Sequence, residues 1–201
     1  MIFRQNSIRL FGAGAVAALL AACGAQESTG YGTGDPLLGD LDGDFSTDFI
    51  GTDGETIGTA AIVDGPNGAL FKVDLEGLSQ GWHGIHLHQV GDCSDTTEGF
   101  KASGGHINPD GNEHGLLNPN GYERADMPNL YAGADGRATA SFFNSYVRVT
   151  PGEEAASLVG AGAILMDPDG FAIVVHENPD DHMTQPIGGA GARVACAAFS
   201  R

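Results

Sequence analysis

The chain has 201 residues and carries 26 acidic against 9 basic side chains, a formal net charge of −17. Its 32 glycines and 9 prolines interrupt it too often for a coiled coil or a long-helix protein, and they follow no Gly-X-Y period that would indicate collagen. The acidic balance argues against a nucleic-acid partner, because phosphate binding needs a clustered cationic face. It argues equally against direct adsorption to anionic lipid.

Residues 1–23 have the pattern of a targeting segment. A basic start with Arg4 and Arg9 precedes an apolar run, LFGAGAVAALLAA, which is too short to span a bilayer as a stable helix. The run ends in LAAC, which resembles the bacterial lipoprotein signal, in which the cysteine is lipidated and becomes the first residue of the mature chain. An ordinary secretory signal that contains a cysteine is the alternative. We therefore expect an exported protein of the periplasm or cell envelope, anchored to a membrane through lipid on Cys23.

Residues 24–45 are rich in Gly, Asp, Ser and Thr and poor in large apolar side chains, which is typical of a flexible tether. The folded domain is expected over residues 46–201. Without the signal segment, the chain keeps 7 basic and 26 acidic residues, a net charge of −19. The remaining cysteines, Cys93 and Cys196, form either a disulfide, which is the commoner outcome in an exported protein, or a pair of metal-binding thiols.

The domain alternates short β-prone runs with turn signals. Residues 69–76, for example, alternate apolar and polar side chains as a half-buried strand does. Two segments rich in turn residues, 91–128 and 177–191, are expected to be long functional loops. We predict an all-β fold, an eight-stranded Greek-key β-barrel or sandwich, with strands at 56–63, 69–76, 82–90, 129–133, 137–143, 161–166, 171–176 and 192–199.

Six of the seven histidines fall in the two long loops or at the strand ends beside them. His86 and His88 flank Leu87 on a predicted strand, so both imidazoles face the same side, where they can bind one ion. Further candidate ligands follow in the first loop and at the end of an apolar strand: His106, His114, Asp126 and His176. Imidazole-rich sites suit copper or zinc better than magnesium or calcium, so the set predicts a transition-metal centre.

Five blocks in order resemble bacterial copper/zinc superoxide dismutase: HGIHLHQVGDC (83–93), SGGHINPDGNEHG (103–115), DMPN (126–129), VVHENPDD (174–181) and GGAGARVAC (188–196). The resemblance covers about residues 45–200. It implies a Greek-key barrel with metals held outside it by the two long loops. It also implies an enzyme that dismutates superoxide to dioxygen and hydrogen peroxide through a copper redox cycle. The alternative is a non-enzymatic copper- or zinc-binding lipoprotein on the same fold.

The resemblance also implies a role for each matching residue. The implied copper ligands are His86, His88, His106 and His176. His106 would bridge copper to zinc and return a proton to the product, and the other implied zinc ligands are His114 and Asp126. The resemblance further implies hydrogen bonds from Asp180 to one ligand of each metal, attraction of superoxide by Arg193, and a disulfide between Cys93 and Cys196. The expected cofactors are copper and zinc, and the expected assembly is a monomer or a homodimer.

Glu123 departs from the family pattern, because it stands where a third zinc histidine is expected, three residues before Asp126. Three interpretations remain: Glu123 binds zinc through an oxygen, His182 replaces the missing imidazole, or the zinc site is weak or empty. We favour Glu123, because two carboxylates and two imidazoles still form a four-ligand zinc set. A solvated Glu123 beside Arg124 is the simpler alternative.

Overall fold

The structure is a computed structural model that describes residues 45–150 and 163–201, so the predicted signal segment and all but the last residue of the predicted tether lie outside the described residues. Two short 3₁₀ turns, Thr96–Glu98 and Lys101–Ser103, lie in the first long loop. The strands of the described part are β1 (Ser46–Gly51), β2 (Thr56–Gly65), β3 (Gly68–Leu75), β4 (Gly81–His83), β5 (Ile85–His88), β6 (Leu130–Ala132), β7 (Ala138–Asn144), β8 (Phe171–His176) and β9 (Arg193–Phe199).

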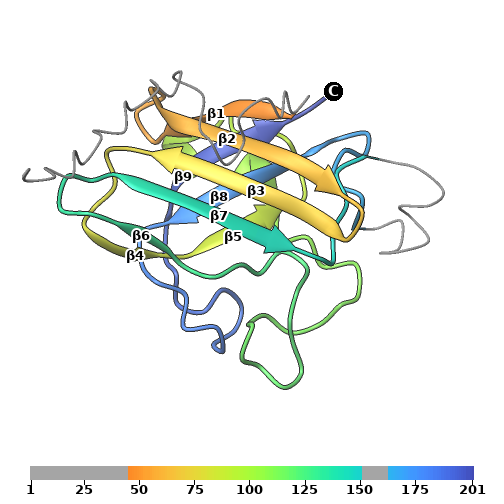
Figure 1. Cartoon of the computed structure of the whole chain (residues 1–201). Helices are drawn as coiled ribbons and strands as arrows, with labels where there is room; N and C mark the ends of the chain where they lie inside the picture. The colour runs from red at the N-terminus through yellow and green to blue at the C-terminus, as the bar shows by residue number, and fades with distance from the viewer. Residues whose placement is uncertain (1–44, 151–162) are drawn as a thin grey trace, which may run out of the picture. The chain divides into compact units, whose positions relative to one another are not determined.

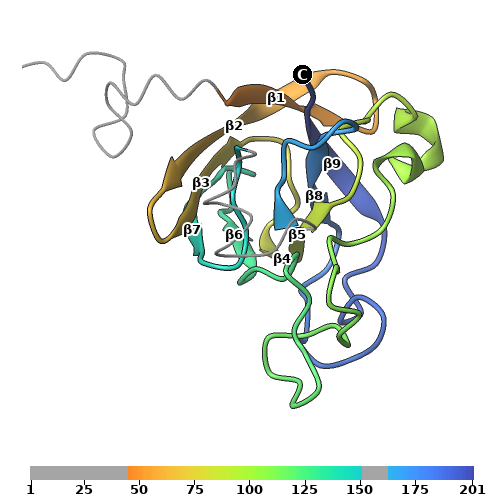
Figure 2. The same cartoon turned by 90° about the vertical axis from the view of Figure 1, so that its right-hand side faces the viewer.

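The strands form one curled antiparallel sheet and one small ribbon. Seven strands pair in the order β5-β8-β9-β1-β2-β3-β7, and β4 pairs with β6 (Figure 1). Figure 2, which looks along the strands, shows β1, β2, β3 and β7 curving around to face β8, β9 and β5. The ribbon connects the two ends of this sheet, because β4 runs into β5 and β6 contacts β7. The predicted all-β class is therefore confirmed.

The core fills the space inside the curled sheet. Strand β3 shows how the sequence specifies it, since every second side chain, Ala69, Phe71, Val73 and Leu75, is buried there. This is the period-two pattern expected of a strand with one buried face. Burial of each large apolar side chain contributes roughly 1.5–3 kcal/mol.

Two predicted strands differ from the structure. The segment 82–90 is not one strand, because the chain leaves one sheet and enters the other at Gly84, whose N–H donates to Asn178 O (2.8 Å). A Cβ on Gly84 would lie 2.9 Å from the Ala190 Cβ, so the second long loop packs directly on this break. The predicted strand 161–166 is wrong in its described part, where Ile164 makes a single isolated bridge to Arg148.

The first long loop covers the outer face of β8. Phe171, Ile173 and Val175 point into the main core, whereas Ala172 and Val174 pack outward against Phe100 and Cys196.

A disulfide fixes this contact: Cys93 and Cys196 are bonded across a sequence separation of 103 residues, as the resemblance implied. A closed loop of that length stabilises a fold by roughly 4–5 kcal/mol in the chain-entropy model. The alternative of two metal-binding thiols is therefore excluded.

The two long loops follow β5 and β8, which are antiparallel, so they leave opposite ends of the sheet and then come together. Figures 1 and 2 show them together below the strands, and Leu117 N donates to His182 O at 3.1 Å where they meet. Among residues 45–150 and 163–201, no helix is long and apolar enough to cross a membrane.

Candidate metal centre

Strand β5 lies at an edge of the large sheet, and backbone from the first long loop pairs with it. Leu87 N donates to Ala125 O (3.1 Å), and Ile107 N donates to Leu87 O (3.0 Å). These bonds bring His106 and Asp126 alongside β5, because the backbone bridges join His88 to His106 and His86 to Asp126. Isolated backbone bridges to the edge of β5 thus position loop residues that are far apart in the sequence.

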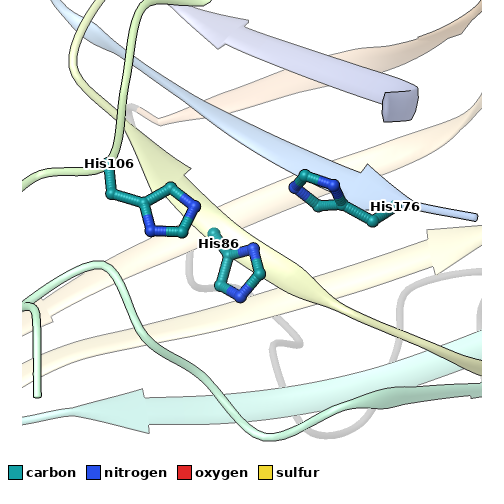
Figure 3. A group of neighbouring side chains, drawn as sticks. All are labelled: His86, His106 and His176. Carbon is teal, nitrogen blue, oxygen red and sulfur yellow. The ribbon is translucent and has the colours of Figure 1, made fainter. Parts of the chain in front are cut away.

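Three imidazoles converge at this edge, as Figure 3 shows: His86 from β5, His176 from the end of β8, and His106 from the loop. A possible donor nitrogen from each lies within 4.8 Å of the others, and all three side chains are largely buried. His88 falls outside that tight group, but its ring centroid is 5.1 Å from that of His106 and 6.1 Å from that of His176.

One nitrogen of each of these four rings is buried and has no hydrogen-bond partner. The four atoms are His86 Nδ1, His88 Nε2, His106 Nε2 and His176 Nε2. Buried polar atoms are normally paired, so four such nitrogens in one place indicate that they bind one ligand together. Imidazole nitrogens suit copper, and these residues fit that ion.

The other nitrogen of three of the rings is held in place. His88 Nδ1 donates to Gly104 O (2.9 Å), and His176 Nδ1 donates to Gly191 O (3.0 Å). A carbonyl oxygen only accepts, so the proton is on Nδ1 and the lone pair of Nε2 is free for a metal. His86 Nε2 is held in the same way, 2.9 Å from Asp180 Oδ2.

Burial keeps these imidazoles neutral at pH 7, which metal binding requires. Desolvation by burial lowers the pKa of His86 to about 4, against the opposing contact with Asp180, and lowers that of His176 to about 3. The pKa of His88 is also held well below its ordinary value by burial.

A second group of donors lies on the other side of His106. Its members, with donor atoms within 4.8 Å of one another, are His106, His114, Glu123 and Asp126. Glu123 Oε2 lies 2.5 Å from His106 Nδ1 and 3.6 Å from His114 Nδ1, and His114 Nδ1 lies 2.7 Å from Asp126 Oδ1. Two nitrogens and two oxygens fit zinc, which accepts both.

Each carboxylate in this group has one oxygen already occupied. Asp126 Oδ2 accepts hydrogen bonds from the backbone N–H groups of Gly115 (2.8 Å) and Glu123 (3.0 Å), which leaves Oδ1 for a cation. Glu123 Oε1 accepts from Asn108 Nδ2 (2.9 Å), which leaves Oε2.

In the second group, the carboxylates and the imidazoles stabilise one another's charged forms. Burial alone would raise the pKa of Glu123, but its contacts with His106 and His114 outweigh burial and lower that pKa to about 2. Burial alone would lower the pKa of His114, but Asp126, Asp180 and Glu123 outweigh it and raise that pKa to about 11. Without a metal, the ring therefore holds a proton that zinc would displace.

His182, the alternative fourth ligand, does not join this group. Its Nδ1 lies 3.3 Å from Asp180 Oδ2, and its Nε2 lies 3.3 Å from Asn129 Nδ2. The geometry thus places Glu123, rather than His182, among the zinc-side donors. A solvated Glu123 also does not fit, because only 12% of its side chain is exposed.

Asp180 connects the two sides. Its Oδ2 lies 2.9 Å from His86 Nε2, and its Oδ1 lies 3.1 Å from His114 Nε2. These contacts lower the pKa of Asp180 against the opposing effect of burial, so it stays ionised.

Sequence reasoning missed the residue that anchors Asp180. Asn129 Oδ1 accepts from Asp180 N (2.9 Å), and Asn129 Nδ2 donates to Asp180 O (2.8 Å). The only signal for this role was the position of Asn129 in the DMPN block. Asn108 was also missed, although it lies two residues after His106.

Arg193 lines a cavity of about 230 Å³ together with His88, His106, His176 and Glu123. Its guanidinium donates to Phe100 O (2.6 Å), Ser103 Oγ (3.0 Å) and Gly104 O (2.9 Å). Burial lowers its pKa, but a guanidinium remains charged in proteins. The site therefore combines buried metal-binding imidazoles with a fixed cation at an open cavity, which suits a small anionic substrate.

Comparisons with known proteins agree with this geometry. The sequence matches the copper/zinc superoxide dismutase family over residues 56–199. It is 48% identical over 147 residues to a Cu-Zn superoxide dismutase of Caulobacter vibrioides, covering 72% of this chain and 78% of the relative. It is 37% identical over 150 residues to Cu-Zn superoxide dismutase 2 of Aquifex aeolicus, covering 74% and 82%.

Two solved structures share the fold. A superoxide dismutase-like protein from Bacillus subtilis has a TM-score of 0.68 and 30% identity, covering 76% of this chain and 96% of that one. The Cu/Zn superoxide dismutase from Brucella abortus has a TM-score of 0.58 and 28% identity, covering 77% and 97%. The chain therefore belongs to the copper/zinc superoxide dismutase family, with superoxide dismutation as its activity and copper and zinc as its cofactors.

Proposed function

We propose that this chain dismutates superoxide at a copper ion held by His86, His88, His106 and His176, in a cavity where Arg193 attracts the anion. The observation that carries this assignment is the set of four unpaired, buried imidazole nitrogens. Three of the rings are oriented by a hydrogen bond at the other nitrogen, as metal-ligating histidines usually are.

The reaction consumes two superoxide anions and two protons and yields one dioxygen and one hydrogen peroxide. Copper supplies the one-electron redox chemistry, which zinc lacks. Arg193 provides positive charge at the cavity, where the low dielectric makes it more effective than a surface charge. His106 presents Nε2 to the copper side and Nδ1 to the zinc side, so its Nε2 can hold a proton and give it to the peroxide product.

Metal storage without catalysis is not favoured. A storage site needs no cation beside the ligands, yet Arg193 lines the cavity with three of the copper-side histidines. The relatives at 48% and 37% identity are also named as superoxide dismutases.

We further propose that Glu123 completes the zinc site with His106, His114 and Asp126. The support is the 2.5 Å approach of Glu123 Oε2 to His106 Nδ1 and the common donor group. Glutamate oxygen is an accepted zinc ligand, so the departure from the family pattern replaces one donor by another.

Finally, we propose that the chain is exported and anchored by lipid at Cys23 in the periplasm or cell envelope, where it acts as a monomer or homodimer. The support is the basic start, the short apolar run and the LAAC ending of residues 1–23. A disulfide between Cys93 and Cys196 agrees with an oxidising compartment.

The copper assignment predicts the behaviour of His176→Ala. Removal of one ligand should lower the dismutation rate per chain by at least about 100-fold, more than loss of an outer hydrogen-bond partner usually costs. Stopped-flow decay of superoxide and the copper electron paramagnetic resonance spectrum measure this. Cobalt bound at the zinc site should keep its visible spectrum as an internal control, and full activity of the variant would contradict the assignment.

The steering role predicts that Arg193→Met slows dismutation by about 10-fold while copper stays bound. Arg137→Met is the matched control, because it also removes one positive charge, but from an exposed pair with Glu76. We expect the control to keep the wild-type rate. Equal rates for the two variants, measured at matched copper content and several salt concentrations, would show that Arg193 does not guide the substrate.

The zinc assignment predicts that Glu123→Gln weakens zinc binding by at least about 10-fold, since the neutral amide is a poorer ligand. Glu123→His, which restores an imidazole, should bind zinc within a few-fold of the wild type. Competition against a chromophoric chelator measures both. Glu98→Gln, an exposed residue of the same loop, is the control. Unchanged affinity in Glu123→Gln would remove Glu123 from the ligand set.

The lipid anchor predicts that the full chain, expressed in a bacterium, enters the membrane fraction and that Cys23→Ala moves it to the soluble fraction. Mass spectrometry of the mature N-terminus should find a lipidated Cys23, and dismutase activity should be equal in both forms. A mature chain that begins elsewhere, or that carries an unmodified Cys23, would refute the anchor.

A further inference from the structure

A side-chain hydrogen bond beside the metal centre joins Asn108 to Glu123. Asn108 Nδ2 donates to Glu123 Oε1 at 2.9 Å, while the other oxygen, Oε2, lies against His106 and His114. The amide thus occupies one oxygen and leaves the other directed at the zinc-side donors. This inference rests on the proposed function, because it takes Glu123 to be a zinc ligand.

We propose that Asn108 is a positioning residue for zinc: it holds Glu123 Oε1, so that the carboxylate binds the metal through Oε2 alone. Asp126 offers the comparison within the same site. Its outer oxygen is fixed by two backbone N–H groups, and its inner oxygen faces His114 Nδ1 at 2.7 Å. Asn108 therefore fixes the outer oxygen of Glu123, as the two backbone N–H groups fix the outer oxygen of Asp126.

Glutamate needs such a partner more than aspartate does. Its longer side chain has more rotamers to lose when it is fixed. Glu123 also lines the open cavity, so an unrestrained carboxylate could turn toward solvent or bind zinc with both oxygens. A hydrogen bond to one oxygen disfavours both arrangements.

Asn108 is itself firmly oriented. Its Oδ1 accepts from Asn112 N (3.0 Å), and its Nδ2 donates to Asn112 O (2.8 Å) as well as to Glu123. These three contacts determine which end of the amide is oxygen, because a backbone N–H requires an acceptor and a carbonyl requires a donor. Asn112 Nδ2 in turn donates to Tyr122 O (3.0 Å), beside Glu123.

Asn108→Asp is the sharpest test. The variant is nearly isosteric and keeps an oxygen for Asn112 N, but it replaces the donor to Glu123 by a second carboxylate. We expect zinc affinity to fall by about 10- to 100-fold, the usual effect of losing an outer hydrogen-bond partner of a ligand. The affinity is measured by chelator competition on the metal-depleted protein, and the visible spectrum of Co²⁺ at the site should change because the carboxylate is released.

Two further variants separate this role from a structural one. Asn120→Ala removes an exposed side chain of the same loop and should leave zinc affinity and the Co²⁺ spectrum unchanged. In the Glu123→His background, Asn108→Asp should no longer weaken zinc binding, because the carboxylate that it disturbs is gone. A loss that depends on Glu123 is a positioning effect.

The remaining outcomes would contradict either the positioning role of Asn108 or the zinc assignment of Glu123. If Asn108→Asp binds zinc within two-fold of the wild type while Glu123→Gln does not, Asn108 has no positioning role, although Glu123 remains a ligand. If Asn108→Asp weakens binding equally in the Glu123→His background, Asn108 acts through the loop, and the proposal is wrong. If Glu123→Gln itself leaves the affinity unchanged, the zinc assignment fails, and this inference fails with it.

Discussion

Two of the contacts of the Asp180 carboxylate, those to His86 and His114, hold the candidate metal centre together. One oxygen orients His86 on β5, and the other orients His114 in the first long loop, so a single buried anion fixes one ligand on each side of His106. The backbone of the second long loop packs closely against this carboxylate. A Cβ on Gly188 would lie 1.6 Å from Asp180 Oδ1, and the residue has a φ of +60°, so glycine is required there by both space and backbone conformation.

The barrel supplies the rigidity that this arrangement needs. Cys93–Cys196 bonds the first loop to β9, and three residues earlier on β9 Arg193 donates to Phe100, Ser103 and Gly104 of the same loop. All three acceptors are uncharged, so these bonds fix the guanidinium without neutralising it. One short strand therefore anchors the loop that carries His106 and presents a cation to the cavity.

The sequence predicts those features that depend on local pattern. Period-two alternation identifies β3, and the His86–Leu87–His88 spacing places both imidazoles on the metal side of β5. What it misses depends on long-range packing. Gly84 ends a strand because the second loop packs against it, and no local signal shows that. In the sequence, Asn129 and Asn108 look like ordinary turn residues. Only the fold shows that they hydrogen-bond to Asp180 and Glu123.

Glu123 also changes the electrostatics of the cavity that it lines. If zinc binds as proposed, the two carboxylates of Glu123 and Asp126 formally balance the two positive charges of the ion, whereas one carboxylate and an extra neutral imidazole would leave one positive charge uncompensated. The zinc side then adds little attraction for an anion. Because the whole chain has a net charge of −17, local attraction must come from the copper side and from Arg193. On the proposed roles of Glu123 and Arg193, the substitution places more of the steering on one guanidinium, which three backbone and hydroxyl oxygens hold in place.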